Sequence, residues 1–128
     1  RINMAVTHAM PVRNGIADYV TGQIDVSGVG KILFQSAGAA VDVASLNFSA
    51  TAFGAAASAV CTAAAITDDT NCTAGTVAIF AVQQNNNTAV FSGSVTATGG
   101  GGDIILSSVA IGQGDTISIS SLTYEAPQ

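Results

Sequence analysis

Apolar and polar residues alternate along much of the chain with a period of two, which is typical of β-strands. The most informative stretch runs from Gly75 to Ala97 and contains two different strand patterns. Residues 77–82 are apolar at every position, and this predicts a strand that is covered on both faces. A run of Gln and Asn (83–87) follows and suits a hairpin loop. In 89–97, apolar or small residues alternate with Ser and Thr, which indicates one buried and one solvated face. We therefore predict the central hairpin of an antiparallel domain here.

Five shorter segments show similar strand signals, separated by turns rich in Gly, Ser and Asn. They are residues 31–35, 41–48, 59–66, 103–107 and 116–124. Within the last of these, the apolar phase shifts by one residue, which predicts a bulge near Ser120 and Ser121. The stretch 51–65 also fits a helical stripe, but Gly54 interrupts it. We favour a loop followed by a strand there.

The N-terminal region has a different period. Between residues 7 and 26, apolar side chains recur every three or four positions, which predicts one face of a helix. These positions are Val12, Ile16, Tyr19, Val20 and Ile24. Thr7 is a suitable N-cap, and Pro11 is tolerated in a first turn because its missing N–H is not needed there. Such a helix is weak on its own and must dock on another surface.

Together these elements predict a mainly β fold: an antiparallel β-sandwich or jelly roll of about seven strands, preceded by one N-terminal helix. The length of 128 residues fits a single domain. We divide it into an N-terminal arm and helix (1–30) and the β-sandwich (31–128).

Charge limits the classes of partner. The chain has 3 Lys and Arg residues against 8 Asp and Glu residues, a formal net charge of −5. Phosphate backbones require clustered cations, so we expect no nucleic-acid partner. Only 9% of residues are charged, which favours a surface partly covered by neighbouring subunits. No apolar run reaches the length of about 18 residues that a membrane-spanning helix needs.

No catalytic constellation is visible. His8 is the only histidine, and no nucleophile–base motif accompanies it. Asp68, Asp69 and Asn71 could offer oxygen ligands to calcium, but their spacing matches no calcium loop, and we expect solvated turn residues. The glycines 99–102 lack the Lys of a phosphate loop and are expected to form a flexible turn. We predict a protein that is not an enzyme and that has no metal or cofactor.

Cys61 and Cys72 flank the loop that contains Asp68 and Asp69. Two interpretations stay open. The pair could form a disulfide, which would stabilise the fold by about 3 kcal/mol. Alternatively, both are unpaired thiols, with Cys61 a small core residue. Spacing alone does not decide between them, because it does not fix the geometry.

The order of these segments resembles a family of small tailed-phage proteins that are encoded near the capsid genes. The segments that carry the resemblance are KILF, ASLNFSATAFGAAASAV, TAAAITDDT, GTVAIFAV, TAVFSGSVTATGGGGDIILSS and IGQGDTISISSLTYEAP. It covers nearly the whole chain from Met4 onward, and it is most specific around Phe53-Gly54 and from Phe91 through Tyr124. The pair Cys61 and Cys72 departs from the family pattern.

The resemblance implies a virion structural protein, a capsid decoration or cement protein on the outer surface of the shell. Its expected partners are the major capsid protein and further copies of itself, as a dimer or trimer. We expect the N-terminal segment to make the contacts between subunits. The residues proposed for this are Met10, Val12, Ile16 and Tyr19.

The alternative function is a carbohydrate- or receptor-binding module on a virion or cell surface. Sugar sites present aromatic platforms, because ring faces pack against C–H surfaces. The chain has no Trp, and its only polar aromatic residues are Tyr19 and Tyr124. We therefore rank this function second.

Overall fold

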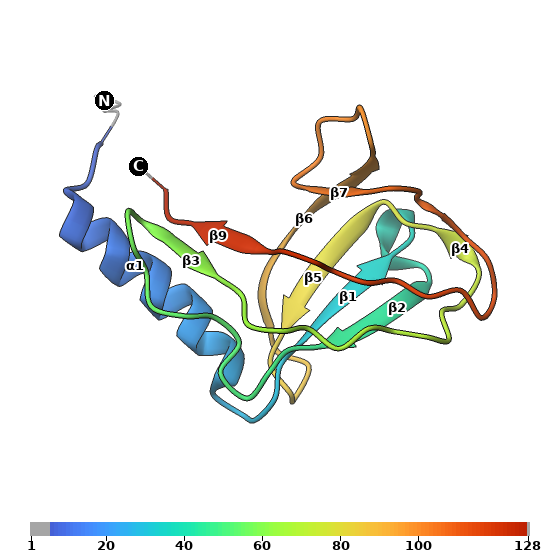
Figure 1. Cartoon of the computed structure of the whole chain (residues 1–128), viewed down its shortest axis with the longest axis horizontal. Coiled ribbons are helices and arrows are strands. Elements are labelled where there is room, and N and C mark those ends of the chain that lie inside the picture. Colours follow the sequence, from blue (N-terminus) through green and yellow to red (C-terminus); the bar gives the residue numbers. More distant parts are fainter. Residues whose placement is uncertain (1–5, 128) are drawn as a thin grey trace.

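The computed structural model describes residues 6–127, and it is mainly β with one N-terminal helix, as predicted (Figure 1). Helix α1 spans Met10–Gly22 and continues into the 3-10 turn η1 (Gln23–Asp25). A second such turn, η2 (Ala37–Ala39), joins the first two strands. The strands are β1 (Lys31–Gln35), β2 (Asp42–Asn47), β3 (Val60–Thr62), β4 (Gly75–Thr76), β5 (Ile79–Gln83), β6 (Ala89–Ala97), β7 (Ile104–Leu106), β8 (Ala110–Ile111) and β9 (Thr123–Glu125).

The strand count of about seven was too low, because the two-residue strands β4 and β8 are too short to produce an alternating pattern. The principal sheet has the order β2-β1-β5-β6-β7. Two small sheets pair β3 with β9 and β4 with β8. The structure does not confirm a two-sheet sandwich or jelly roll; it has one curled five-stranded sheet, crossed by the C-terminal part of the chain (Figure 1).

The principal sheet is mixed, so the purely antiparallel prediction was wrong. Strand β7 runs parallel to β6, with Val95 beside Ile104. The glycine loop 99–102 does not make a hairpin; it folds back onto β6. The Thr96 hydroxyl accepts a hydrogen bond from the Gly102 N–H at 3.0 Å, which holds the loop there. The lack of side chains in the loop allows this close approach.

The central hairpin is confirmed. Strand β5 lies between β1 and β6, so both of its edges are hydrogen-bonded. Phe80 and Val82 are buried on one face, and Ile79 and Ala81 are half-buried on the other. The β5–β6 turn contains Asn87 with a φ of 69°, a left-handed conformation that Asn tolerates.

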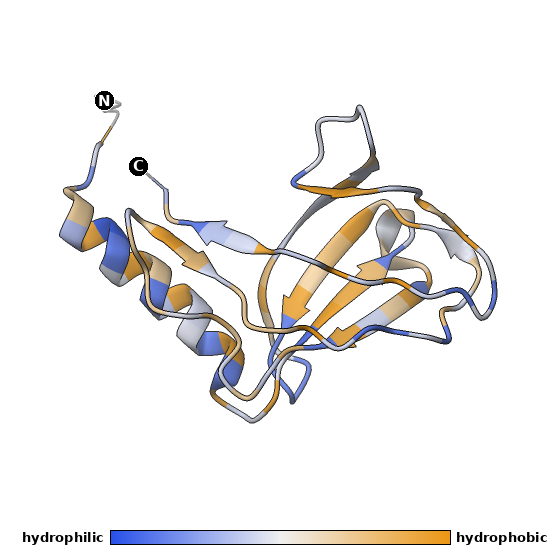
Figure 2. Ribbon diagram, viewed as in Figure 1, coloured by the Kyte–Doolittle hydropathy of each residue, from blue (hydrophilic) through white to orange (hydrophobic). Residues whose placement is uncertain are grey.

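The core lies between this sheet and the segments that cross it. Its largest fully buried side chains include Phe34, Leu46 and Ile32, which come from β1 and β2. Phe48 and Phe53 extend it, with ring centroids 5.7 Å apart. Figure 2 shows the same concentration of apolar residues along β1 and β5.

Two predicted strands are shorter than expected. Residues 59–66 form only β3, and the helical alternative for 51–65 is wrong. In 116–124, Ile117 makes an isolated bridge with Asp69 and regular pairing resumes only at β9. The one-residue phase shift near Ser120 and Ser121, from which we predicted a bulge, lies in this interruption between Ile117 and β9. Neither segment has an uninterrupted partner strand, and a strand pattern without a partner does not form a ladder.

Two glycines give opposite predictions for Ala substitution. At Gly30, between η1 and β1, an added Cβ would lie 2.9 Å from the Ile24 carbonyl oxygen and 3.0 Å from that of Gln83. Backbone atoms cannot move aside, so Gly30→Ala should lower the free energy of unfolding by about 1–3 kcal/mol.

Gly15 is in α1 with nothing within 4 Å of the added atom. Gly15→Ala should therefore raise the free energy of unfolding by about 1 kcal/mol. Urea unfolding of the two variants and the parent measures both changes in the free energy of unfolding. Equal changes in the two variants would contradict the close packing at Gly30.

Candidate functional site

Helix α1 and η1 dock through polar side chains. Oxygens of Asn14, Asp18 and Asp25 accept hydrogen bonds from backbone N–H groups in residues 52–59, with N···O distances of 2.7, 2.8 and 3.1 Å. That stretch contains little regular strand pairing of its own, so its N–H groups need acceptors from elsewhere. The helix supplies them.

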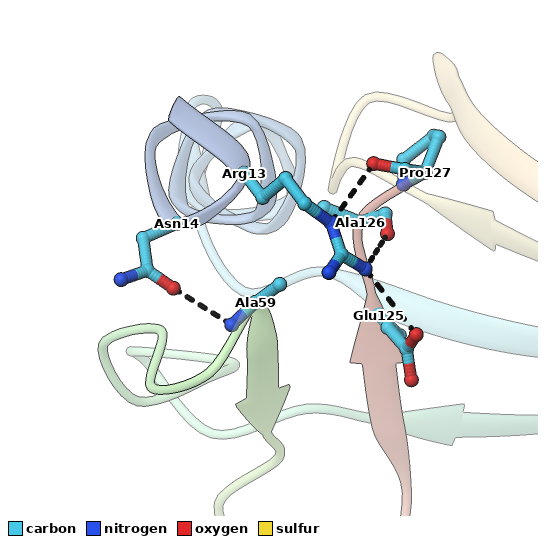
Figure 3. Close-up of polar contacts among 6 residues, drawn as sticks. All are labelled: Arg13, Asn14, Ala59, Glu125, Ala126 and Pro127. Carbon is cyan, nitrogen blue, oxygen red and sulfur yellow. Dashed lines mark hydrogen bonds and ion pairs between the residues drawn. The ribbon is translucent and has the colours of Figure 1, made fainter. Parts of the chain in front are cut away.

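Asn14 also supports a strained turn. Ala59 is fully buried and has a φ of 65°, which is unfavourable for a residue with a Cβ. The Asn14 side-chain oxygen accepts a hydrogen bond from the Ala59 N–H (Figure 3). The Ala59 carbonyl accepts one from the Ala126 N–H at 2.9 Å. The turn is therefore held from both the helix and the C-terminal segment.

Arg13 connects the helix to the end of the chain. Its Nη2 donates to the Ala126 carbonyl at 2.9 Å and lies 3.3 Å from the Glu125 carboxylate, and its Nε donates to the Pro127 carbonyl at 3.2 Å (Figure 3). The Arg13 side chain is only 12% exposed. Charge-assisted hydrogen bonds of this kind are stronger than neutral ones.

Small residues complete the inward side of α1. Ala17 is fully buried and Thr21 nearly so, and the Thr21 hydroxyl donates to the Ala17 carbonyl at 2.9 Å. It also lies 3.6 Å from the sulfur of Cys61. Their small volume lets the helix approach β3 and β9 closely.

The outward side of α1 is apolar. Tyr19 is 70% exposed, Val12 50% and Met10 44%. Ile16 is half-buried and packs against the edge of the core. Of the predicted stripe, only Ile24 is fully buried. The predicted contact residues Met10, Val12 and Tyr19 are thus accessible, and we call Val12 and Tyr19 the outward face.

The outward face carries no charge. The charged side chains of α1, Arg13 and Asp18, are both engaged on the inward side. Val26, just past η1, extends the exposed apolar surface and is 64% exposed. A neutral, apolar helix face of this kind is suited to contact with another protein surface.

Cys61 and Cys72 are both free and both buried, so the alternative of two unpaired thiols is the one found. Cys61 lies on β3, where its sulfur is 3.7 Å from the Asp18 carboxylate. Cys72 contacts a different loop, with its sulfur 3.6 Å from the Asp69 carbonyl oxygen. Burial raises the pKa of both thiols, and the neighbouring carboxylates raise it further. Such thiols are poor nucleophiles at neutral pH.

The acidic loop has a structural role. The Asp69 carboxylate accepts hydrogen bonds from the backbone N–H groups of Ser45 and Asn71, both at 2.9 Å. Within residues 6–127, no group of three or more His, Cys, Asp or Glu side chains could hold a metal ion. The same part of the chain contains no helix long and apolar enough to cross a membrane.

Sequence reasoning missed an aromatic cleft. It has a volume of about 450 Å³ and lies between β6, β7 and β9. Phe80, Phe91 and Tyr124 line it, together with Asp103 and Glu125. These residues come from separate strands, and no local pattern links them. The alternation in β6 gave the only signal, since it placed Phe91 on the inward phase.

Comparison of the chain with known protein families, with curated proteins and with solved structures found no match.

Loss of the Asn14 acceptor should destabilise the fold. In Asn14→Ala the buried Ala59 N–H loses its partner, and we expect the free energy of unfolding to fall by about 1–3 kcal/mol in urea titrations. Asn14→Asp keeps an acceptor oxygen and should recover most of the loss. If the Ala variant were as stable as the parent, the helix would not depend on this contact.

The buried thiols predict alkaline destabilisation. Their pKa is raised in the folded protein, so the unfolded chain releases these protons at lower pH. The contribution of the thiols to the free energy of unfolding should therefore be constant below pH about 8 and fall as the pH rises above about 8.5. Urea titrations between neutral and alkaline pH under reducing conditions measure this slope. A Cys61→Ala/Cys72→Ala variant should show a shallower slope, and an equal slope would assign the effect to other groups.

Proposed function

We propose that the protein is a structural subunit of a virion, a capsid decoration protein that attaches to neighbouring shell subunits through the outward face of α1. The observation that carries this proposal is the orientation of the helix: polar side chains point inward to hydrogen bonds, and apolar ones point outward. In an isolated chain that arrangement leaves apolar area in water. A neighbouring subunit would remove it, at about 25 cal/mol for each Å² covered.

The low charge of the chain supports the same function. Few charges and a neutral outward face reduce the desolvation penalty of association. Each contact would be small, but many copies on a symmetric shell act together, so modest contacts can give firm attachment. The resemblance of the sequence to small tailed-phage proteins supplies the identity of the shell, with the major capsid protein as the partner.

Particle composition provides the first test. Virions purified by density gradient from the virus that encodes the chain should contain it in a fixed ratio to the major capsid protein, measured by quantitative mass spectrometry. Mild chaotrope should release it without opening the shell. Its absence from purified particles would reject the proposal.

The outward face provides the second test. Val12→Ser/Tyr19→Ser should bind stripped particles at least tenfold more weakly in co-sedimentation, because it removes two exposed apolar side chains from the contact. Val41→Ser is the matched control: it changes an exposed Val in the β1–β2 connection and should bind like the parent. Circular dichroism should show both variants folded. Equal binding by the two variants would place the attachment surface elsewhere.

A further inference from the structure

One wall of the aromatic cleft is formed by three rings in contact with one another. The Phe80 and Phe91 rings meet edge to face with centroids 6.2 Å apart, and Phe91 contacts Tyr124 at 5.1 Å. These rings come from β5, β6 and β9, so three strands position them. Phe91 and Tyr124 are only half-buried, which leaves part of each side chain exposed beside the cleft. Rings that are already held in place lose little entropy when a ligand packs against them.

A carboxylate is fixed beside this wall. One oxygen of Asp103, Oδ2, accepts hydrogen bonds from the N–H and hydroxyl of Ser94, at 3.0 and 3.1 Å. The Ser94 hydroxyl also accepts one from the Asp103 N–H at 3.1 Å. The other oxygen, Oδ1, makes no hydrogen bond to any residue in 6–127, so it can accept one from a ligand. Asp103 is therefore an oriented acceptor.

Gly93 leaves space for both the Phe80 ring and the Asp103 carboxylate. It lies opposite Phe80 in the β5–β6 register. A Cβ at this position would lie 2.7 Å from the Phe80 ring and 2.7 Å from Asp103 Oδ2. The absence of a side chain thus lets the ring and the carboxylate approach each other.

We propose that this cleft binds a neutral pyranose sugar. The sugar's C–H face would pack against the exposed side of Tyr124 and Phe91, and one of its hydroxyls would donate to Asp103 Oδ1. The hydroxyls of Ser92 and Thr123, which also line the cleft, offer further polar contacts. A cleft of about 450 Å³ is within the usual range for small-ligand sites.

The charge of the cleft determines which sugars it can bind. Of the two carboxylates that line the cleft, Glu125 is paired with Arg13 at 3.3 Å, whereas Asp103 has no Lys or Arg partner among the described residues. It would repel sialic acid and sulfated sugars. A second cleft of about 240 Å³, between β7 and residues 118–123, shares Asp103 and Thr123 with the first. Its Ser hydroxyls at 118, 120 and 121 would suit a second sugar unit, so the ligand class extends to a neutral oligosaccharide.

Saturation-transfer NMR with a panel of neutral, anionic and cationic probes tests the proposal. The panel comprises glucose, galactose, mannose, their disaccharides, sialic acid and choline. We expect transfer to the C–H face of at least one neutral sugar and none to sialic acid. No transfer to any neutral sugar at millimolar concentration would overturn the proposal, as would transfer to choline alone, which would indicate a cation site.

Substitutions at Tyr124 separate the ring from the hydroxyl. Tyr124→Ala should weaken binding about tenfold or more by titration NMR, and Tyr124→Phe should retain most of it, because the ring face is kept. Asp103→Asn retains an acceptor oxygen, whereas Asp103→Ala should weaken binding. Tyr19→Ala is the matched control, since it removes an exposed Tyr from α1 and should leave sugar binding unchanged. Equal loss in Tyr19→Ala and Tyr124→Ala would place the sugar outside the cleft.

This inference and the proposed function fail separately. Val12→Ser/Tyr19→Ser should lose particle attachment and keep sugar binding, while Tyr124→Ala should do the reverse. Should Tyr124→Ala be unfolded by circular dichroism, Ser92→Leu, which narrows the cleft from an exposed position on β6, replaces it. Undiminished sugar binding by Ser92→Leu would then count against the cleft.

Discussion

The docking of α1 depends on satisfying backbone N–H groups that the sheets leave unpaired. Residues 52–59 pass between the principal sheet and the helix with little strand pairing of their own. A buried N–H without an acceptor costs about 1–3 kcal/mol, so several such groups would rival the stability of a whole domain. Asn14, Asp18 and Asp25 accept hydrogen bonds from this segment, and Arg13 donates to the carbonyls at the other end of the chain. The helix therefore acts as the missing partner of an irregular stretch.

This requirement determines which side of the helix faces the solvent. Only one side of a helix can face the body of the protein, and in α1 that side carries the polar side chains. The apolar positions Val12 and Tyr19 are then turned outward by the 100° step between residues, whatever their hydrophobicity. The exposed apolar surface is a consequence of polar docking, and in the proposed function another protein covers it. The hydrogen bonds that orient α1 therefore expose the surface through which we propose that the protein assembles.

The sequence predicted those elements whose pattern is local. Strand β1 and the β5–β6 hairpin were predicted correctly because their alternation reports burial directly, and Pro11 marked the first turn of α1. The orientation of α1 was left open, since hydrophobic periodicity identifies the apolar side of a helix but not whether the same chain or a neighbour covers it. The parallel β6–β7 pair was missed because it depends on the Gly102–Thr96 contact, which has no periodic signal. The aromatic cleft combines Phe80, Phe91 and Tyr124 from distant strands, so only tertiary structure reveals it.

Strand β9 contacts both helix α1, which carries the outward face, and the aromatic cleft. Tyr124 packs against Phe91 in the cleft, and the next residue, Glu125, pairs with Arg13 at the rim. The Ala126 carbonyl also accepts from Arg13, and the Ala126 N–H donates to Ala59. The short strand is thus held by the helix on one side and by the ring cluster on the other. Because the outward face and the cleft use different residues, both can be occupied at the same time. A decoration protein that is fixed to a shell through α1 would keep its cleft available to a ligand.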